Sequence, residues 1–292
     1  MNVLHIHEQL EERGGTEKHI ARLRKIFSQN KLHTQLLAVR PGSGNRFYWN
    51  IGESNSSSSL ESIDKLDEKI DALLLNCLPN IIIIHGITFP KFIEVLFQKA
   101  RCPIFRYMHE PRMVCPGHSK FWHKSEACCE KPMGLHCLIH AYTEICAPRH
   151  PKKLIAEFNS TRFEISVAAQ RYAKVIVASD YIQDQATLVG FPPEKIVKIP
   201  PPLDTEPLAY HPVPTDSPRI LFVGRMSRTK GPHTLIRLLA PLLLTHPEWQ
   251  LDFVGDGLIK DECTALAAQA GIASQTHFHG WKSGHELEAL YR

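Results

Sequence analysis

The stretch "RILFVGRMSRTKG", residues 219–231, decides the fold. Its apolar first half has the composition of a buried strand and ends in Gly224. The residues that follow predict a helix over 231–245. A strand that turns at once into a helix is the repeating unit of a parallel α/β sheet. The turn itself contains two cations, Arg225 and Lys230.

The same alternation of strand and helix extends through most of the chain. Strands are expected at residues 2–7, 33–39, 80–86, 103–109, 173–179, 195–200, 219–224, 249–255 and 276–280. Helices are expected at residues 14–30, 61–77, 89–100, 151–172, 180–189, 231–245, 258–271 and from 283 onward. Residues 40–60, rich in Gly, Ser and Asn, are expected to form a loop, and residues 110–150 to be irregular. Continuous Ile and Val runs such as "NIIIIHG" are typical of a parallel sheet covered on both faces. The pattern therefore predicts a doubly wound α/β fold, with binding at the carboxyl ends of the strands.

A proline-rich segment, "PPPLDTEPLAYHPVPTDSP" at residues 200–218, interrupts the alternation. Because proline cannot continue a helix or a central strand, the segment predicts a linker. We expect one Rossmann-like domain over residues 1–205, with an irregular insert at about 110–150, and a second over 218–292. The second has only three expected strands before its last helix. We therefore expect it to be incomplete, with the chain ending inside the domain.

Composition is that of an ordinary soluble protein. The chain has 292 residues, 43% of them hydrophobic and 22% charged, and a formal net charge of +4. No basic run with interleaved aromatics is present, so a nucleic-acid partner is not expected. No segment reaches the length of about 18 apolar residues that spans a bilayer, and the N-terminus lacks the pattern of a signal peptide. These features predict a cytoplasmic protein whose eight cysteines are mostly thiols.

The turn after Gly224 has the features of an anion site. Backbone N–H groups of such a turn, and the N-terminus of the helix that follows, attract negative charge. Arg225 can grip phosphate oxygens with its fork of donors, and Lys230 adds a compact charge. The alternative is a surface loop with two solvated basic side chains, and spacing alone does not decide between the two.

Two further glycine turns lie at expected carboxyl ends of strands. Gly255, Asp256 and Gly257 follow the second strand of the second domain, where glycines would let a nucleotide approach the backbone. Gly14 and Gly15 stand between the first strand and the first helix, where their N–H groups could meet a phosphate or a sugar. Plain turns without a ligand are the alternative at both places.

Three segments together resemble a known family. They are "GGTEKHI" at 14–20, "FVGRMSRTKG" at 222–231 and the stretch from "DFVGDG" at 252 to the last residue. They resemble the GT-B-fold glycosyltransferases of family 4, retaining enzymes that use nucleotide sugars and have two Rossmann-like domains. The resemblance implies that Arg225 and Lys230, with Gly224, hold the diphosphate of the donor. It also implies that the Gly-Asp-Gly turn lies by the base and that the Gly-Gly loop faces the donor phosphate and the acceptor.

The resemblance points to "YMHE" at 107–110 as well. Relatives often carry a histidine followed by an acid here, near the transferred sugar. His109 is therefore the expected catalytic residue, contacting a sugar hydroxyl or the developing charge, and Glu110 is a weaker candidate. A structural histidine at a strand end is the alternative. Since fixed cations can stabilise the departing diphosphate, and no Asp-x-Asp motif is present, no metal is expected.

Two departures from the family pattern stand out. Relatives usually show I-P-N-G-V-D where this chain has "IPPPLD", so Pro201 and Pro202 replace a permissive turn although Asp204 is retained. The acidic signature E-x-x-x-x-x-x-x-E of the family would follow the last matched segment, beyond Arg292. In the family its glutamates contact the sugar and ribose of the donor, so the chain as given is expected to lack activity.

The expected insert is rich in cysteine and histidine. Its members are Cys115, Cys128, Cys129, Cys137, Cys146, His118, His123, His136 and His140, and His109 directly precedes it. Thiolate and imidazole are zinc ligands, but no C-x-x-C pair is present. Reduced thiols packed beside the acceptor site are the favoured interpretation, and a structural metal is the alternative.

The sequence therefore predicts a glycosyltransferase that moves a sugar from a UDP- or GDP-sugar to a glycan or lipid-linked acceptor, with retention. The mild positive charge is compatible with peripheral contact at the inner membrane face. The alternative is a truncated, inactive remnant that only binds nucleotide sugars. An NAD-dependent oxidoreductase is disfavoured, because neither "GRMSRTKG" nor "GDGLIKD" supplies G-x-G-x-x-G.

Overall fold

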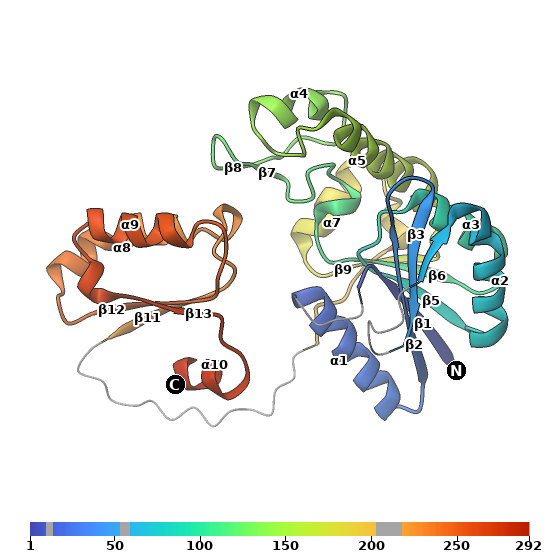
Figure 1. Ribbon diagram of the computed structural model, residues 1–292, viewed down its shortest axis with the longest axis horizontal. Helices are drawn as coiled ribbons and strands as arrows, with labels where there is room; N and C mark the ends of the chain where they lie inside the picture. The colour runs from blue at the N-terminus through green and yellow to red at the C-terminus, as the bar shows by residue number, and fades with distance from the viewer. Residues whose placement is uncertain (10–13, 53–58, 203–217, 292) are drawn as a thin grey trace. The chain divides into compact units, whose positions relative to one another are not determined.

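The computed structural model describes residues 1–9, 14–52, 59–202 and 218–291. The chain divides into two compact units, residues 1–204 and 205–292, drawn from blue to yellow and from orange to red in Figure 1. Asp204 and most of the expected linker lie outside the described residues.

The first unit is built on one large sheet with the strand order β10-β9-β6-β5-β1-β2-β3-β4. All neighbours from β10 to β2 are parallel, and β3 and β4 add an antiparallel edge. The strands are β1 (Asn2–His7), β2 (His33–Pro41), β3 (Arg46–Ile51), β4 (Ser59–Ser62), β5 (Ile81–Ile84), β6 (Ile104–Met108), β9 (Lys174–Val177) and β10 (Ile196–Lys198). From β1 the chain adds β2, β3 and β4 on one side and then β5 on the other side, so the strand order reverses at β1. Ligands of open α/β sheets bind at such a point.

Helices cover both faces of this sheet. They are α1 (Gly15–Gln29), η2 (Ile63–Lys65), α2 (Leu66–Cys77), α3 (Pro90–Lys99), α5 (Pro151–Phe163), the π-helical turn η4 (Glu164–Ala168), α6 (Ala169–Arg171), α7 (Asp180–Leu188) and η5 (Pro193–Lys195). Leu4 and Ile6 of β1 belong to the core that α2 and α3 complete. Val3 faces the other way and packs in a cluster with Phe27 of α1. The strand residues are thus apolar on both faces, which confirms the doubly wound arrangement.

Two of the expected irregular regions contain regular structure. Within residues 40–60, β3 pairs with β2, and Phe47 and Trp49 alternate into the core. The expectation of a loop was wrong there, because the Gly- and Ser-rich flanks outweigh a six-residue strand in a composition-based prediction. Within residues 110–150 lie η3 (Pro111–Met113), the hairpin of β7 (Phe121–Trp122) and β8 (Ala127–Cys128), and α4 (His136–Thr143).

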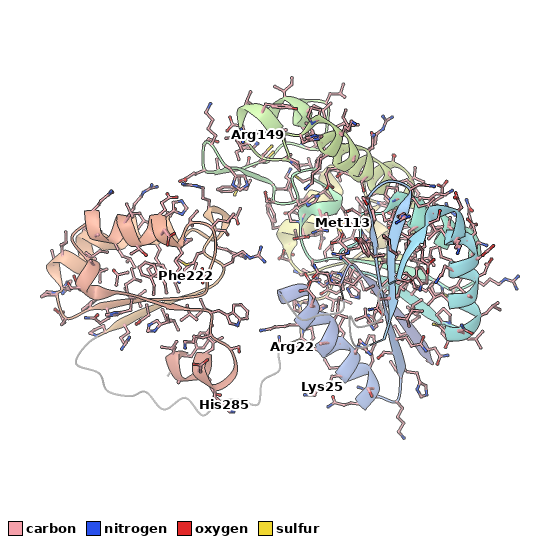
Figure 2. All side chains as sticks on the ribbon, viewed as in Figure 1. Arg22, Lys25, Met113, Arg149, Phe222 and His285 are labelled. Atoms are coloured by element: carbon pink, nitrogen blue, oxygen red, sulfur yellow. The ribbon has the colours of Figure 1, made fainter. Side chains whose placement is uncertain are left out.

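The second unit has a three-stranded parallel sheet among its described residues, in the order β11-β12-β13. Its elements are β11 (Arg219–Val223), η6 (Arg228–Lys230), α8 (Pro232–Thr245), β12 (Gln250–Val254), α9 (Lys260–Gln269), η7 (Ala273–Gln275), β13 (Thr276–Gly280) and α10 (Gly284–Tyr291). Helices α8 and α9 lie together over one face of the sheet, and α10 lies on the other side (Figure 1). Phe222, labelled in Figure 2, packs on Phe253 with ring centroids 5.4 Å apart.

Among the helices of the described residues, none has both the length and the apolar character that crossing a bilayer requires.

Candidate functional site

In the second unit, the loops after β11 and β12 are joined backbone to backbone. The Gly224 N–H donates to the Val254 carbonyl at 2.9 Å, and the Met226 N–H donates to the Asp256 carbonyl at 2.9 Å. The Ile259 N–H returns to the Met226 carbonyl at 3.2 Å. These bonds hold the two loops together as one rigid edge. The Gly224 N–H, one of the turn N–H groups expected to attract an anion, is therefore already bound to the Val254 carbonyl.

The glycines of the second loop allow this close approach. Gly255 and Gly257 have φ values of +131° and +155°, which residues with a side chain rarely adopt. A β-carbon would stand 2.0 Å from the carbonyl oxygen of Gly224 in the first case and 2.4 Å from that of Met226 in the second. Asp256 accepts a hydrogen bond from the Gly257 N–H at 2.8 Å, so its carboxylate closes the turn. The Gly-Asp-Gly sequence is therefore explained locally by backbone packing.

Arg225 and Lys230 differ from the other cation of their loop. Arg228 makes a two-pronged ion pair with Glu262, with both distances at 2.8 Å. Arg225 and Lys230 are exposed, and neither side chain makes an ion pair or a hydrogen bond with the described part of the chain. Helix α8 begins beside them with Gly231 as an N-cap that offers no side-chain acceptor. Two uncompensated cations thus flank an uncapped helix N-terminus, an arrangement that attracts anions.

In the first unit, histidines gather at the carboxyl edge of β1, β5 and β6. His5 Nδ1 lies 3.0 Å from His85 Nε2, and His85 Nδ1 lies 2.9 Å from His109 Nε2. His109, expected from the sequence, follows β6, whereas His85 follows β5 and His5 lies within β1. Because β5 is hydrogen-bonded to both β1 and β6, the three imidazoles form one continuous chain.

Burial keeps these imidazoles neutral. Desolvation is the main cause that lowers the pKa of His5 to about 3, and the positive charge of Arg24 is the next largest cause. Desolvation and then His19 lower the pKa of His109 to about 2, and desolvation holds the pKa of His85 well below its usual value. His19 of α1 packs edge-on against His109, and its own pKa falls to about 4 through desolvation and the charge of Arg22, which is labelled on α1 in Figure 2.

The Gly14–Gly15 loop is closed by a neighbouring side chain. Glu17 folds back toward the start of α1, where backbone N–H groups of Gly14 and of Glu17 itself stabilise its carboxylate. His7 accepts from the Gly86 N–H through Nδ1 at 3.3 Å and contacts Glu17 through Nε2 at 3.1 Å. An imidazole that accepts at Nδ1 must carry its proton on Nε2, so His7 donates to Glu17. This bond is the main cause that lowers the pKa of Glu17.

Arg112 joins the loops after three neighbouring strands. Its NH1 group donates to Glu8 after β1 at 2.8 Å and to the Gly86 carbonyl after β5 at 3.0 Å. Its Nε lies 2.8 Å from a carboxylate oxygen of Glu110 after β6. Glu110, expected as a weaker site candidate, is therefore held by a cation.

A second arginine, Arg106, stabilises the loop after β5 from inside the core. Arg106 of β6 is fully buried and donates to the carbonyls of His85 and Ile87 and to Glu164, the last at 2.8 Å. Tyr172 donates to the other oxygen of Glu164 at 2.9 Å. Glu164 opens the π-helical turn, a feature that often marks functional regions.

Sequence reasoning missed His5, His85, Arg106 and Arg112. A signal existed for the first three, because each is a polar residue inside or directly after a strongly apolar strand. Such residues are buried only when they have hydrogen-bond partners. Arg112 lies in a segment without periodicity, and nothing in the sequence distinguishes it.

The cysteines of the insert remain thiols, and in the described part of the chain no group of three or more His, Cys, Asp or Glu side chains is placed to hold a metal ion. Desolvation, with Cys115 and Cys137 nearby, raises the pKa of Cys146 to about 12. The Cys146 sulfur is therefore protonated at neutral pH.

Part of the chain is similar in sequence to known proteins. The family described as Glycosyl transferases group 1 matches residues 208–292. A Lipopolysaccharide 1,6-galactosyltransferase of Salmonella typhimurium is 28% identical over 126 residues, covering 40% of this chain and 35% of that protein. The chain thus aligns with about a third of that relative's length.

Solved structures extend the likeness over the whole chain. The apo form of the lipopolysaccharide outer core galactosyltransferase WaaB superposes with a TM-score of 0.56 at 16% identity, covering 100% of this chain and 71% of that one. Anabaena HepE, solved with UDP and glucose, gives a TM-score of 0.55 at 16% identity, covering 97% and 70%. The chain accordingly has the GT-B fold, and residues 208–292 match the family described as Glycosyl transferases group 1.

Proposed function

We propose that this protein transfers a sugar from a UDP-sugar, or from a GDP-sugar, to a glycan or lipid-linked acceptor with retention of configuration. The single observation that carries the proposal is the state of Arg225 and Lys230. Both are exposed cations without a partner in the described part of the chain, and they lie beside the uncapped start of α8. Within a group 1 domain, the anion that fits this place is the diphosphate of a nucleotide sugar.

The chemistry follows from the charge that develops on the leaving group. Cleavage of a sugar–diphosphate bond builds negative charge on the departing phosphate. Cations positioned at that phosphate therefore stabilise the transition state more than the ground state. Arg225 provides a fork for two oxygens and Lys230 a single compact charge. Gly224 acts through packing, since its N–H already binds Val254.

A UDP-sugar is the preferred donor and a saccharide the preferred acceptor. HepE was solved with UDP and glucose, and the Salmonella relative is a lipopolysaccharide galactosyltransferase. The Gly-Asp-Gly turn, rigidly joined to the diphosphate loop, is the proposed seat of the base. The lipid-linked class of acceptor would bring the protein to the inner face of a membrane.

For a retaining transfer, the state of the carboxylates in the first unit favours one of the two possible routes. Glu8 and Glu110 are paired with Arg112, and Glu17 binds His7. A carboxylate held by a cation or a donor is a poor nucleophile. Of these three carboxylates none stands free, so a front-face displacement, in which the departing phosphate receives the acceptor proton, is favoured over a covalent intermediate.

Calorimetric titration of the chain with UDP tests the proposal. We expect Arg225→Ala and Lys230→Ala each to weaken UDP binding on the order of tenfold or more, since each removes a charge-assisted contact. Arg228→Ala is the matched control, because it removes a cation from the same loop that Glu262 already neutralises. Equal losses in all three variants would mean that only net charge matters, and unchanged binding in the first two would refute the phosphate site.

A further inference from the structure

The histidine chain runs from the interior of the first unit to its carboxyl edge. His5 and His85 are 0% exposed, whereas His109 is partly exposed. Neighbouring rings lie edge to edge in nearly parallel planes, with centroids 5.3 Å apart for His5 and His85 and 5.2 Å for His85 and His109. We propose that His5 and His85 are positioning residues that hold His109 as the neutral Nδ1–H tautomer, with this N–H offered to a sugar hydroxyl. The target of that N–H rests on the function proposed above, whereas the tautomer does not.

Neutrality restricts the chain to two arrangements. Burial lowers the pKa of each imidazole far below neutral pH, so each ring has one N–H and one acceptor nitrogen. The two short contacts must therefore be oriented in the same sense. Either every N–H points outward toward His109, or every N–H points inward toward His5.

The inner end of the chain favours the outward sense. His5 Nε2 is buried and has no hydrogen-bond partner in the described part of the chain. The inward sense would place an N–H there without an acceptor, and orphaned buried N–H groups are rarer than unmet acceptors. The outward sense leaves a lone pair on His5 Nε2. The positive charge of Arg24 acts on His5 and favours a lone pair there over an N–H. His5 then donates to His85, His85 donates to His109 Nε2, and the His109 proton lies on Nδ1.

The same inner end argues against proton transport. A relay must accept a proton at one end and release it at the other, but His5 Nε2 is closed off from solvent. The surroundings instead immobilise the rings. Arg106 binds the His85 carbonyl, Tyr107 stacks on His109 with centroids 4.3 Å apart, and His19 lies edge-on to it at 4.9 Å. The result is a fixed neutral donor, which suits an oxygen acceptor and does not suit a general base.

Nitrogen-15 NMR of the histidine-labelled full chain tests the tautomer directly. Long-range proton–nitrogen correlations distinguish Nδ1–H from Nε2–H, and His109→Gln assigns the signals. We expect His109 in the Nδ1–H form at neutral pH. An Nε2–H form, or rapid exchange between the two, would overturn the inference. This readout needs no nucleotide, so it stands apart from success or failure of the UDP titration.

Two substitutions of His85 then separate positioning from packing, with UDP-glucose as donor probe and hydrolysis to UDP and glucose as assay. His85→Leu removes the donor to His109, and we expect kcat to fall on the order of tenfold with KM changed much less. His85→Asn keeps an amide N–H near the position of Nδ1 and should restore most of the rate and the tautomer.

If His85→Leu does not fold, His5→Leu replaces it as the test. This variant leaves the His85–His109 contact in place and should lose the fixed tautomer of His109. His33→Leu, at an exposed position, is the control. Equal losses in the Leu and Asn variants with an unchanged His109 tautomer would show a purely structural role.

Discussion

The carbonyl oxygen of Gly224 lies 2.0 Å from the point where a β-carbon on Gly255 would stand. The two glycines therefore permit a backbone contact between the loops after β11 and β12 that no other residue at 255 would allow. The proposed diphosphate site depends on this contact, because Arg225 follows Gly224 directly.

Gly255→Ala should destabilise the second unit by at least about 2 kcal/mol, because it combines a backbone clash with a φ of +131°. Urea denaturation followed by circular dichroism measures the effect. Gly224→Ala is the matched control, since its β-carbon would meet only the Phe222 ring at an ordinary 3.6 Å. Equal stability of the two variants would contradict the argument from close approach.

Arg106→Met should unfold or strongly destabilise the first unit. Arg106 and Glu164 are 0% and 1% exposed, so removal of the guanidinium leaves a buried carboxylate without its counter-charge. Breaking such a pair from one side costs about 3–5 kcal/mol. Lys99→Met breaks an ion pair with Asp71 at the surface and should leave the midpoint of thermal unfolding nearly unchanged. A small effect at Arg106 would mean that Glu164 is protonated in the native state.

The first unit should lose stability as the pH falls from about 6.5 toward 4.5. Burial lowers the pKa of His5, His19 and His109 to about 3, 4 and 2, so the unfolded chain binds their protons first and the native state does not. Stability is therefore full above the unfolded pKa and declines below it, by up to about 1.4 kcal/mol per pH unit for each histidine. Glu17, whose pKa is also lowered, adds to the loss only below its ordinary value of 4.5.

Urea titrations at pH 7 and pH 5 measure this slope, and His19→Leu should reduce it by about one proton. A slope that stays the same in this variant would show that His19 is protonated in the folded protein.

The sequence predicts the layout of this protein better than its site. Ile and Val runs identify the parallel strands because a strand covered on both faces has no freedom to be polar, and Leu4 and Val3 show those two faces. Composition fails for β3, where Trp49 and Phe47 are buried between flanks that read as loop. Site residues are harder to foresee, because the histidine chain is created by strand order, and strand order is a long-range property that no local pattern encodes.

Arg112→Lys should impair the proposed reaction while the fold is retained. A lysine can donate to one of the groups that Arg112 joins, but its point charge cannot bind Glu8, the Gly86 carbonyl and Glu110 together. The freed loops would let His109, one residue before Glu110, shift away from the sugar hydroxyl that it is proposed to contact, and errors of about 1 Å cost on the order of 100-fold in rate. We expect kcat for UDP-glucose hydrolysis to fall and the UDP affinity to stay the same, because the proposed diphosphate site belongs to the second unit. A loss of UDP affinity together with unchanged kcat would place the role of Arg112 in donor binding instead.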